Sequence, residues 1–559
     1  MVNARRHTRG IVATLAAVGL LVGALALSPA SASTGEARVR QADEEGTIRI
    51  AAEEEPFCAD WISTCAALAW GNWALGNLTM PQALNVDTSG NYVPGDMLVD
   101  FPTLDAGPPM TVTYRIKEEA VWSDGTPITS ADFEYTWDQI VNGKNIYDST
   151  GYVLIESVDA TDPKVAVVTF SEPFAAWRDL FGGFYFLLPS HLLDGENRHK
   201  IMKDGYDFSG GAWQLDGGSD GWDKGRSITL VPNEAYWGIQ PTIQKVIFQF
   251  IPDSAAELEA ITSGQVVAAY PLPIEGAVDT VEASDTLDYE LNFGNQFEAF
   301  WINADSFPLD SEPLRQAVAY ATDREAIVEA IVVPAINEGQ VLDSFVVPTF
   351  ETFHEPAFAQ YRRDLDMVDE LMTGDGWEKN GDGVWEKDGE TASFVLNTTT
   401  GNAQRELTEQ LWQSQLTEAG FDMTFKNLDA GPLFGARLPS GKYNVGLYAS
   451  VGTPDPGLCL LFCSENIPGK RNKFAGQNWT RSDDPEIDET LKAVDVTLDD
   501  AVRIEAAKAG QQAIARYVVG IPLFQTPTMF IYDTTRLGGR LEDNTVMGPF
   551  FTMNEWILL

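Results

Sequence analysis

Residues that build metal centres are scarce in this chain. Its 559 residues include four histidines and four cysteines. The C-x6-C and C-x3-C spacings of the cysteines differ from those of zinc sites, and the histidines do not cluster with them. We therefore expect neither a metal site nor a cofactor. The cysteines are Cys58, Cys65, Cys459 and Cys463.

The motifs of common catalytic sites are missing as well. The chain has no Walker A loop, no Gly-x-Ser-x-Gly elbow and no His-Glu-x-x-His pair. The segment 435–442 fails the phosphate-loop spacing, and Tyr443 stands where that loop needs serine or threonine. Because 82 acidic residues supply carboxylate pairs by chance, an exported hydrolase is only a remote alternative. We expect a protein that is not an enzyme.

Basic residues are few relative to acidic ones. The chain has 37 Lys and Arg against 82 Asp and Glu, a net charge of −45. A field of this sign repels nucleic acids and anionic membrane surfaces, so we expect no nucleic-acid partner. The acids are dispersed along the chain, which favours a role in solubility or in a salty medium over a functional acidic patch.

Only one apolar run is long, and it lies at the N-terminus. Three arginines precede the run 11–27, and residues 30–32 offer a small-residue cleavage site. This pattern predicts a signal peptide over residues 1–32. No cysteine follows the run, so we expect no lipoprotein anchor, and no later segment is long and apolar enough to cross a bilayer. We expect an exported protein of the extracellular space or cell envelope.

An exported protein with an even number of cysteines is expected to form disulfides. Four cysteines allow three pairings. We favour the two local pairs, Cys58 with Cys65 and Cys459 with Cys463, because each closes a short loop. A long-range bridge between Cys58 and Cys459 stays open.

The block 111–143 carries the most specific pattern. Residues 111–117 alternate apolar and polar side chains, which predicts a strand with one buried face. Residues 122–127, Trp-Ser-Asp-Gly-Thr-Pro, form a turn. Thr129-x-x-Asp132 is a capping box that begins a helix, and Gly143 ends it.

This block resembles the signature of family 5 extracellular solute-binding proteins, the oligopeptide- and dipeptide-binding receptors of ABC importers. Three later blocks follow in the order that the family has, namely 210–238, 300–332 and 450–456. The first of these ends in the family's Asn-x-x-Tyr-Trp motif, at residues 233–237. The resemblance extends from about Thr47 to the C-terminus.

The resemblance implies an α/β fold: a two-lobed periplasmic-binding-protein-like fold of type II, in the large peptide-receptor subclass, with an extra small domain. Lobe I would take residues 33–80, 208–298 and 521–559, the small inserted domain 81–207, and lobe II 299–520. A short peptide would bridge the lobes and close the hinge. The closed receptor, a monomer, would then be recognised by the permease subunits of an ABC transporter.

Local patterns predict further elements. Residues 47–51 are predicted to form an opening strand. Residues 85–94 are a polar turn, where the resemblance implies the family's short hairpin. Residues 394–425 predict a β-α-β unit with a parallel strand pair, its helix capped at Gly420. Thr322-x-x-Glu325 predicts a second capping box. Two helices are expected near the end, over 485–494 and 498–518.

The candidates for ligand contact come from two segments. Three tryptophans fall within residues 61–73, where the resembled family has one wall of its cleft. The other segment continues a strand predicted over 443–449, where the family's strand-to-loop connection contacts ligand. Core packing is a comparable role for each of them. The candidates are Trp70, Asn72, Trp73, Tyr448, Ala449, Ser450, Val451, Gly452, Thr453 and Asp455.

One departure from the family concerns the ligand directly. Peptide-binding members usually place an aspartate in the segment 450–456 that pairs with the peptide's amino terminus. Aligning on Asp455-Pro456 puts Gly452 at that position, or Thr453 if the gap is shared differently. Either Asp455 takes over the role, or the ligand carries no free α-amine at that point.

Two other functions stay open. An oligosaccharide or glycolipid is the alternative ligand, because sugars stack on indole faces and the aspartate is missing. A scaffold that keeps the fold without transport is the other alternative, favoured by the absence of an encoded lipid anchor.

Overall fold

The computed structural model describes residues 45–66, 69–182, 185–452, 455–472, 474, 476–544 and 546–559. The predicted signal peptide, residues 1–32, and the candidate Thr453 lie outside these residues.

A mixed sheet runs through the described part of the chain. Its 11 strands are β1 (Thr47–Ala52), β8 (Trp213–Leu215), β9 (Trp222–Asp223), β10 (Ser227–Pro232), β11 (Lys245–Phe250), β12 (Ala268–Ala269), β13 (Leu287–Ile302), β17 (Ser393–Asn397), β18 (Asp422–Phe425), β19 (Val445–Val451) and β20 (Gly520–Asp533). Their order is β18-β17-β19-β13-β20-β12-β1-β11-β10-β8, with β9 paired to β10.

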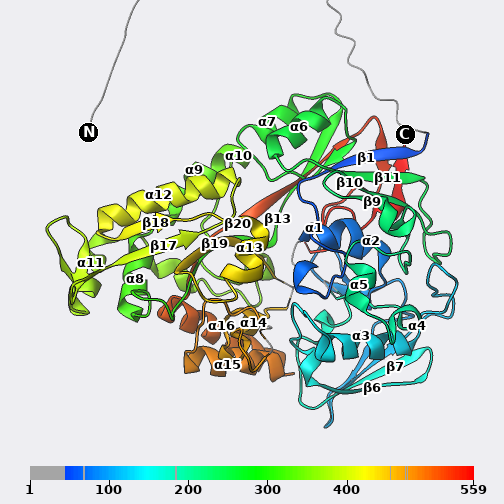
Figure 1. The fold of residues 1–559 in the computed structure, drawn as a ribbon, viewed down its shortest axis with the longest axis horizontal. Helices are drawn as coiled ribbons and strands as arrows, with labels where there is room; N and C mark the ends of the chain where they lie inside the picture. The colour runs from blue at the N-terminus through cyan, green and yellow to red at the C-terminus, as the bar shows by residue number, and fades with distance from the viewer. Residues whose placement is uncertain are drawn as a thin grey trace, which may run out of the picture. The chain divides into compact units, whose positions relative to one another are not determined.

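The two longest strands, β13 and β20, lie in the middle of the sheet, between its β17–β19 side and its β12–β1 side (Figure 1). They pair antiparallel with each other. β19 joins one end of β13, over Gln296–Ile302, and β12 joins the far end of β20, at Ile531 and Tyr532. Most side chains of β20 are buried, as expected for a strand covered on both faces.

A smaller sheet lies outside this path, in the order β4-β5-β7-β6. Its strands are β4 (Thr103–Asp105), β5 (Thr111–Arg115), β6 (Ile155–Asp162) and β7 (Val165–Phe170). Helix α3 (Ser130–Asn142) packs on β6 and begins with the predicted capping box. The Asp132 carboxylate accepts the Thr129 N–H at 2.9 Å, and the Thr129 side chain accepts the Asp132 N–H.

Replacing Thr129 by alanine is expected to lower the unfolding free energy by about 1 kcal/mol, because the first turn of α3 loses one acceptor for its unpaired N–H groups. Urea unfolding measures the change. Thr129→Ser keeps the hydroxyl and is the matched control. Equal losses in the two variants would contradict the capping role.

The remaining elements are short strands and helices. The strand pairs and triplet are β2 (Leu84–Val86) with β3 (Tyr92–Pro94), β14 (Glu378–Lys379) with β15 (Trp385–Lys387) and β16 (Glu390–Thr391), and β21 (Leu537–Gly539) with β22 (Trp556–Leu558). The helices are α1 (Ala69–Gly71), α2 (Asn77–Thr79), α4 (Ser190–Leu193), α5 (Arg198–Met202), α6 (Ser254–Thr262), α7 (Ala277–Glu282), α8 (Glu312–Ala321), α9 (Arg324–Ile331), α10 (Val333–Ile336), α11 (Leu365–Gly374), α12 (Ala403–Ala419), α13 (Ala430–Pro432), α14 (Leu458–Phe462), α15 (Pro485–Val496) and α16 (Asp500–Tyr517).

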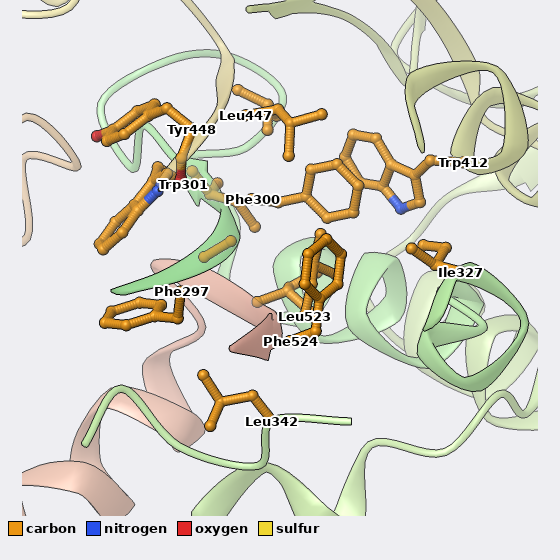
Figure 2. Packing of buried hydrophobic residues seen from close by; sticks show 14 of the residues in the cluster. Phe297, Phe300, Trp301, Ile327, Leu342, Trp412, Leu447, Tyr448, Leu523 and Phe524 are labelled. Atoms are coloured by element: carbon orange, nitrogen blue, oxygen red, sulfur yellow. Dashed lines mark hydrogen bonds between the residues drawn. The ribbon is translucent and has the colours of Figure 1, made fainter. Parts of the chain in front are cut away.

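Two large hydrophobic cores hold these layers together. The residues of one core come mostly from the second half of the chain, and Figure 2 shows part of this core. In it the Trp412 ring stacks on the Phe300 ring, with the two ring centroids 3.9 Å apart. Tyr448 stacks on Trp301 in the same core, at 5.2 Å. The other core contains the β1 side of the large sheet together with the smaller sheet. Aromatic pairs of this kind add to the free energy gained from buried apolar area.

Several local predictions are confirmed. The opening strand is β1, and the hairpin is β2 with β3. Strands β17 and β18 are parallel and flank α12, which ends at Gly420 with a φ of 94°. Cys58 pairs with Cys65, and Cys459 pairs with Cys463.

The second predicted capping box is wrong. Helix α9 is capped by Asp323, whose side chain accepts the Ala326 N–H at 2.9 Å. The Thr322 hydroxyl instead donates back to the Val318 carbonyl in α8, at 2.8 Å. Thr322 and Asp323 are adjacent, and each has a side chain that can cap a helix. After the tight turn between α8 and α9, Asp323 is the residue at the N-cap position of α9. The boundaries predicted for the lobes and the inserted domain stay a prediction.

Candidate ligand-binding site

The end of β19 offers a strand edge to a ligand. On one side it pairs with β13, from Val445 opposite Ile302 to Val451 opposite Gln296. On the other side β17 pairs only with Val445 and Gly446. Within the described residues, the segment 449–451 therefore has no strand neighbour on that edge. Ala449, Ser450, Val451 and Gly452 are half-buried.

An unpaired amide lies beside this segment. Asn295 is 1% exposed, and neither its side-chain oxygen nor its side-chain nitrogen has a hydrogen-bond partner among the residues that the structure describes. The Gly452 N–H donates to its main-chain carbonyl at 3.4 Å. A buried amide without partners costs free energy, so a polar group is expected to bind here.

A bulge in β13 places this amide. The register with β20 shifts between Phe293 and Phe297, and the Gln525 side chain donates to the Gly294 carbonyl at 2.7 Å. Sequence reasoning missed Asn295. The available signal was the Gly294-Asn295 step, which interrupts the alternation of apolar and polar residues over 287–293, because glycine in a strand often marks a bulge.

The predicted tryptophans lie in the core on the β1 side. Trp70 and Trp73 are 3% and 6% exposed and pack edge to face, with ring centroids 5.9 Å apart. Both rings also contact Tyr270. The indole N–H of Trp73 has no partner within the described residues. Asn72 is buried beside them, at 8% exposed.

A buried carboxylate links Tyr270 to the two long strands. Asp543 accepts hydrogen bonds from the Tyr270 hydroxyl at 3.1 Å, the Thr528 hydroxyl at 2.7 Å and the Asn292 amide at 3.2 Å. Burial raises the pKa of the Asp543 carboxyl. The tryptophan cluster is thereby joined to β13 three residues before the unpaired amide.

Two glutamates at the end of β1 face a paired arginine. Arg405, in the first turn of α12, donates to Glu298 of β13, with Nη2 and Oε1 2.6 Å apart. Glu298 is the register partner of Ala449. Burial and the neighbouring charge of Glu54 raise the pKa of Glu53 to about 8, although the charge of Arg405 opposes the shift.

Asp455 is occupied by an ion pair. Its carboxylate accepts from the Arg503 guanidinium, and both side chains are 6% exposed. The Arg503 Nε atom donates to the Val494 carbonyl at 2.8 Å. Since this carboxylate already has a buried cationic partner, the ion pair favours the alternative in which the ligand meets no α-amine-binding aspartate here.

Contacts of the smaller-sheet region reach the same neighbourhood. The Tyr92 hydroxyl donates to Asp179, and the Ala175 N–H donates to the Asp495 carbonyl at 2.5 Å. Burial, together with the nearby charge of Asp455, raises the pKa of Asp495 to about 8. The smaller-sheet region and α15 are therefore joined directly, through Ala175 and Asp495.

No cluster of three or more potential metal ligands occurs among the described residues. In the same part of the chain, no helix combines the length and apolar character needed to cross a bilayer.

Comparison with known proteins gives consistent results. Residues 107–468 match the family model described as "Bacterial extracellular solute-binding proteins, family 5 Middle". The chain is 25% identical over 475 residues to the oligopeptide-binding protein OppA of Mycobacterium tuberculosis, covering 81% of this chain and 76% of that protein. It is 30% identical over 213 residues to the probable monoacyl phosphatidylinositol tetramannoside-binding protein LpqW of the same species, covering 35% of this chain and 32% of that protein.

The fold is also that of solved structures. The oligopeptide-binding protein AppA of Bacillus subtilis, in complex with a nonapeptide, superposes with a TM-score of 0.79 at 18% identity, over 92% of this chain and 99% of AppA. Such neighbours have the two-lobed type II fold of substrate-binding receptors, which bind and do not catalyse. The chain belongs to the family 5 extracellular solute-binding proteins, the non-enzymatic substrate-binding receptors of ABC importers.

Proposed function

We propose that this protein captures short peptides and delivers them to the permease of an ABC importer. The main support is the unpaired edge of β19 at residues 449–451, beside the unpaired Asn295 amide. An extended peptide satisfies such an edge with its own main chain, and this mode of binding gives affinity without reading the side chains. The relatives named as oligopeptide-binding proteins support the same ligand class.

The proposed receptor is a monomer that is exported, and its two lobes close on the ligand about the β13 and β20 connections. In this proposal the lobes take the segments predicted from sequence. One wall of the proposed ligand cleft includes Trp70, Asn72 and Trp73, and the other wall includes residues 448–452.

A non-peptide ligand is the second candidate. The segment 449–452 carries no acidic side chain, and Asp455 is paired with Arg503, so no free carboxylate in the described part of this segment meets an α-amine. LpqW, which matches over a third of this chain, is named for a glycolipid. A scaffold without transport is the third candidate.

Native mass spectrometry of the protein purified without refolding, followed by denaturation, distinguishes these candidates. A ladder of short peptide masses is the expected result. A single sugar or lipid mass would overturn the peptide assignment and keep the receptor. An empty protein would favour the scaffold.

Asn295→Leu is expected to separate binding from stability. The variant should bind a captured peptide about tenfold more weakly, because one hydrogen bond to the ligand is lost. Its ligand-free form should be as stable as the wild type or more so, because an unpaired buried amide is removed. Calorimetric titration and thermal unfolding measure the two effects.

Asn303→Leu is the matched control. The Asn303 amide is equally buried but donates to the Tyr443 and Gly441 carbonyls at 2.7 and 2.9 Å. This variant should lose stability while keeping its peptide affinity. Unchanged affinity in Asn295→Leu would contradict a role of this amide in binding.

A further inference from the structure

A separate cavity lies on the β1 side of the large sheet. Its volume is about 80 Å³, well above the 10–15 Å³ or so that one water molecule needs. The lining comes from the β2 region, β8, the loop after β10 and the C-terminal segment. None of the residues proposed above for peptide binding lines it.

Three residues of this lining carry polar atoms that have no hydrogen-bond partner within the described residues. They are the Gln82 Oε1, the Asn85 Oδ1 and the Trp213 Nε1 atoms, all buried. Gln82 is 6% exposed and Trp213 fully buried. Two unpaired acceptors and one unpaired donor on one cavity leave a set of hydrogen bonds for an occupant to complete.

A hydrogen-bond relay fixes which atom of Gln82 is unpaired. The Asn77 amide nitrogen donates to the Met547 carbonyl, so its oxygen is the atom that faces Gln82. The Gln82 nitrogen must therefore donate to that oxygen, at 3.2 Å. Turning the Gln82 amide would oppose two oxygens, so the free atom is an acceptor.

Other polar groups of the lining are already paired. The Tyr236 hydroxyl donates to the Asp96 carboxylate, and the Trp237 indole donates to the Asp96 carbonyl at 3.1 Å. Asp96 is the charged residue of the described lining, which contains no lysine, arginine or histidine. Tyr236 and Trp237 present adjacent aromatic rings, with centroids 4.9 Å apart.

These groups exclude most small ligands. An anion finds no cation and is repelled by Asp96. A carboxylate cannot donate to Gln82 or Asn85. An ammonium group can donate but cannot accept from the Trp213 N–H. A hydroxyl group does both, because its oxygen accepts while its proton is donated.

We propose that this cavity is a second binding site, separate from the β19 edge, that takes a vicinal diol of the kind found in glycerol or on a sugar ring. Its two hydroxyls donate to the Gln82 and Asn85 oxygens, and one of the oxygens accepts the Trp213 N–H. The aromatic rings of Tyr236 and Trp237 cover the C–H groups. The inference does not depend on the proposed peptide ligand.

Indole NMR tests the site directly. The protein, labelled with ¹⁵N-tryptophan, is titrated with glycerol and, separately, with methyl α-D-glucopyranoside. The Trp213 signal is assigned by its loss in Trp213→Phe. We expect a saturable shift of this signal with at least one probe. A saturable shift with glycerol alone indicates that the natural occupant is a free small polyol. A saturable shift with the glucoside indicates that it is a sugar unit.

Trp61 is an internal control, because its indole N–H is also buried and has no partner among the described residues, but Trp61 does not line the cavity. Its signal should not move. Asn85→Leu should weaken binding at least tenfold, and the Asn85 oxygen that it removes has no partner in the described part of the chain. A Trp213 shift that never saturates, that Trp61 shares, or that Asn85→Leu leaves unchanged would overturn the proposal and assign the cavity to ordered water.

Discussion

Replacing Arg503 by methionine is expected to lower the unfolding free energy by about 3–5 kcal/mol, because it leaves the buried Asp455 carboxylate without its cationic partner. Both side chains are 6% exposed, so water replaces little of the lost interaction. The variant also loses the hydrogen bond to the Val494 carbonyl, which fixes the end of α15 against α16. Urea unfolding with the disulfides intact measures the change.

Two further variants make this result specific. Arg516→Met removes an exposed arginine, 42% accessible, that pairs with Asp484 and Glu486, and it should cost less than about 1 kcal/mol. Adding Asp455→Leu to Arg503→Met removes both charges and should recover much of the loss. A cost for Arg503→Met no larger than that for Arg516→Met would contradict the assignment.

The second large effect is a pH dependence that originates at Glu257. This residue of α6 is fully buried, and neither carboxylate oxygen has a partner within the described residues. Burial, together with the nearby charges of Glu53 and Asp253, raises its pKa from 4.5 to about 9. The folded protein therefore keeps this proton to a higher pH than the unfolded chain does.

The sign follows from linkage. The contribution of Glu257 to stability is fully present below a pH of about 4.5 and is lost as the pH rises through about 9. Glutamine is neutral at every pH, so Glu257→Gln should gain stability relative to the wild type as pH rises. Each pH unit within this window is worth up to about 1.4 kcal/mol, so the difference should reach several kcal/mol by pH 8 or so.

Denaturant unfolding at a series of pH values measures this difference. Glu259→Gln, on an exposed position of the same helix, is the control, and its profile should run parallel to that of the wild type. Glu53 and Asp495, whose pKa values burial raises to about 8, stay in both proteins, so subtracting the profiles leaves the titration of Glu257 together with its coupling to Glu53. Parallel profiles for Glu257→Gln and wild type would show that the carboxylate is ionised in the folded protein.

Sequence patterns anticipated the parts of the fold that depend on neighbouring residues. Three of these parts involve residues that are close in sequence. They are the capping box at Thr129 and Asp132, the parallel unit of β17, α12 and β18, and the short loops of both disulfides. Even between adjacent residues the sequence pattern predicted the wrong helix cap, because Asp323 and not Thr322 caps α9. The motif at residues 122–127 indicated the protein family, because the order of its residues is specific.

The binding features were decided by contacts between distant segments. The segment 449–451 was a candidate from sequence, but its unpaired edge exists because β17 stops pairing at Gly446. Asn295 is buried and unpaired because β13 shifts register against a strand more than 200 residues away. Asp455 is a candidate ligand contact from sequence, and only the structure shows that it pairs with Arg503 of α16.

The sequence by itself therefore determined the class of protein and the local elements, and it supplied a candidate region for the site. The tertiary structure alone decided which polar groups of that region are already paired and which are free for a ligand. The physical reason is that periodicity and capping report on residues within one element. Hydrogen-bond partners and burial depend on strand register and packing between elements, which no local pattern encodes.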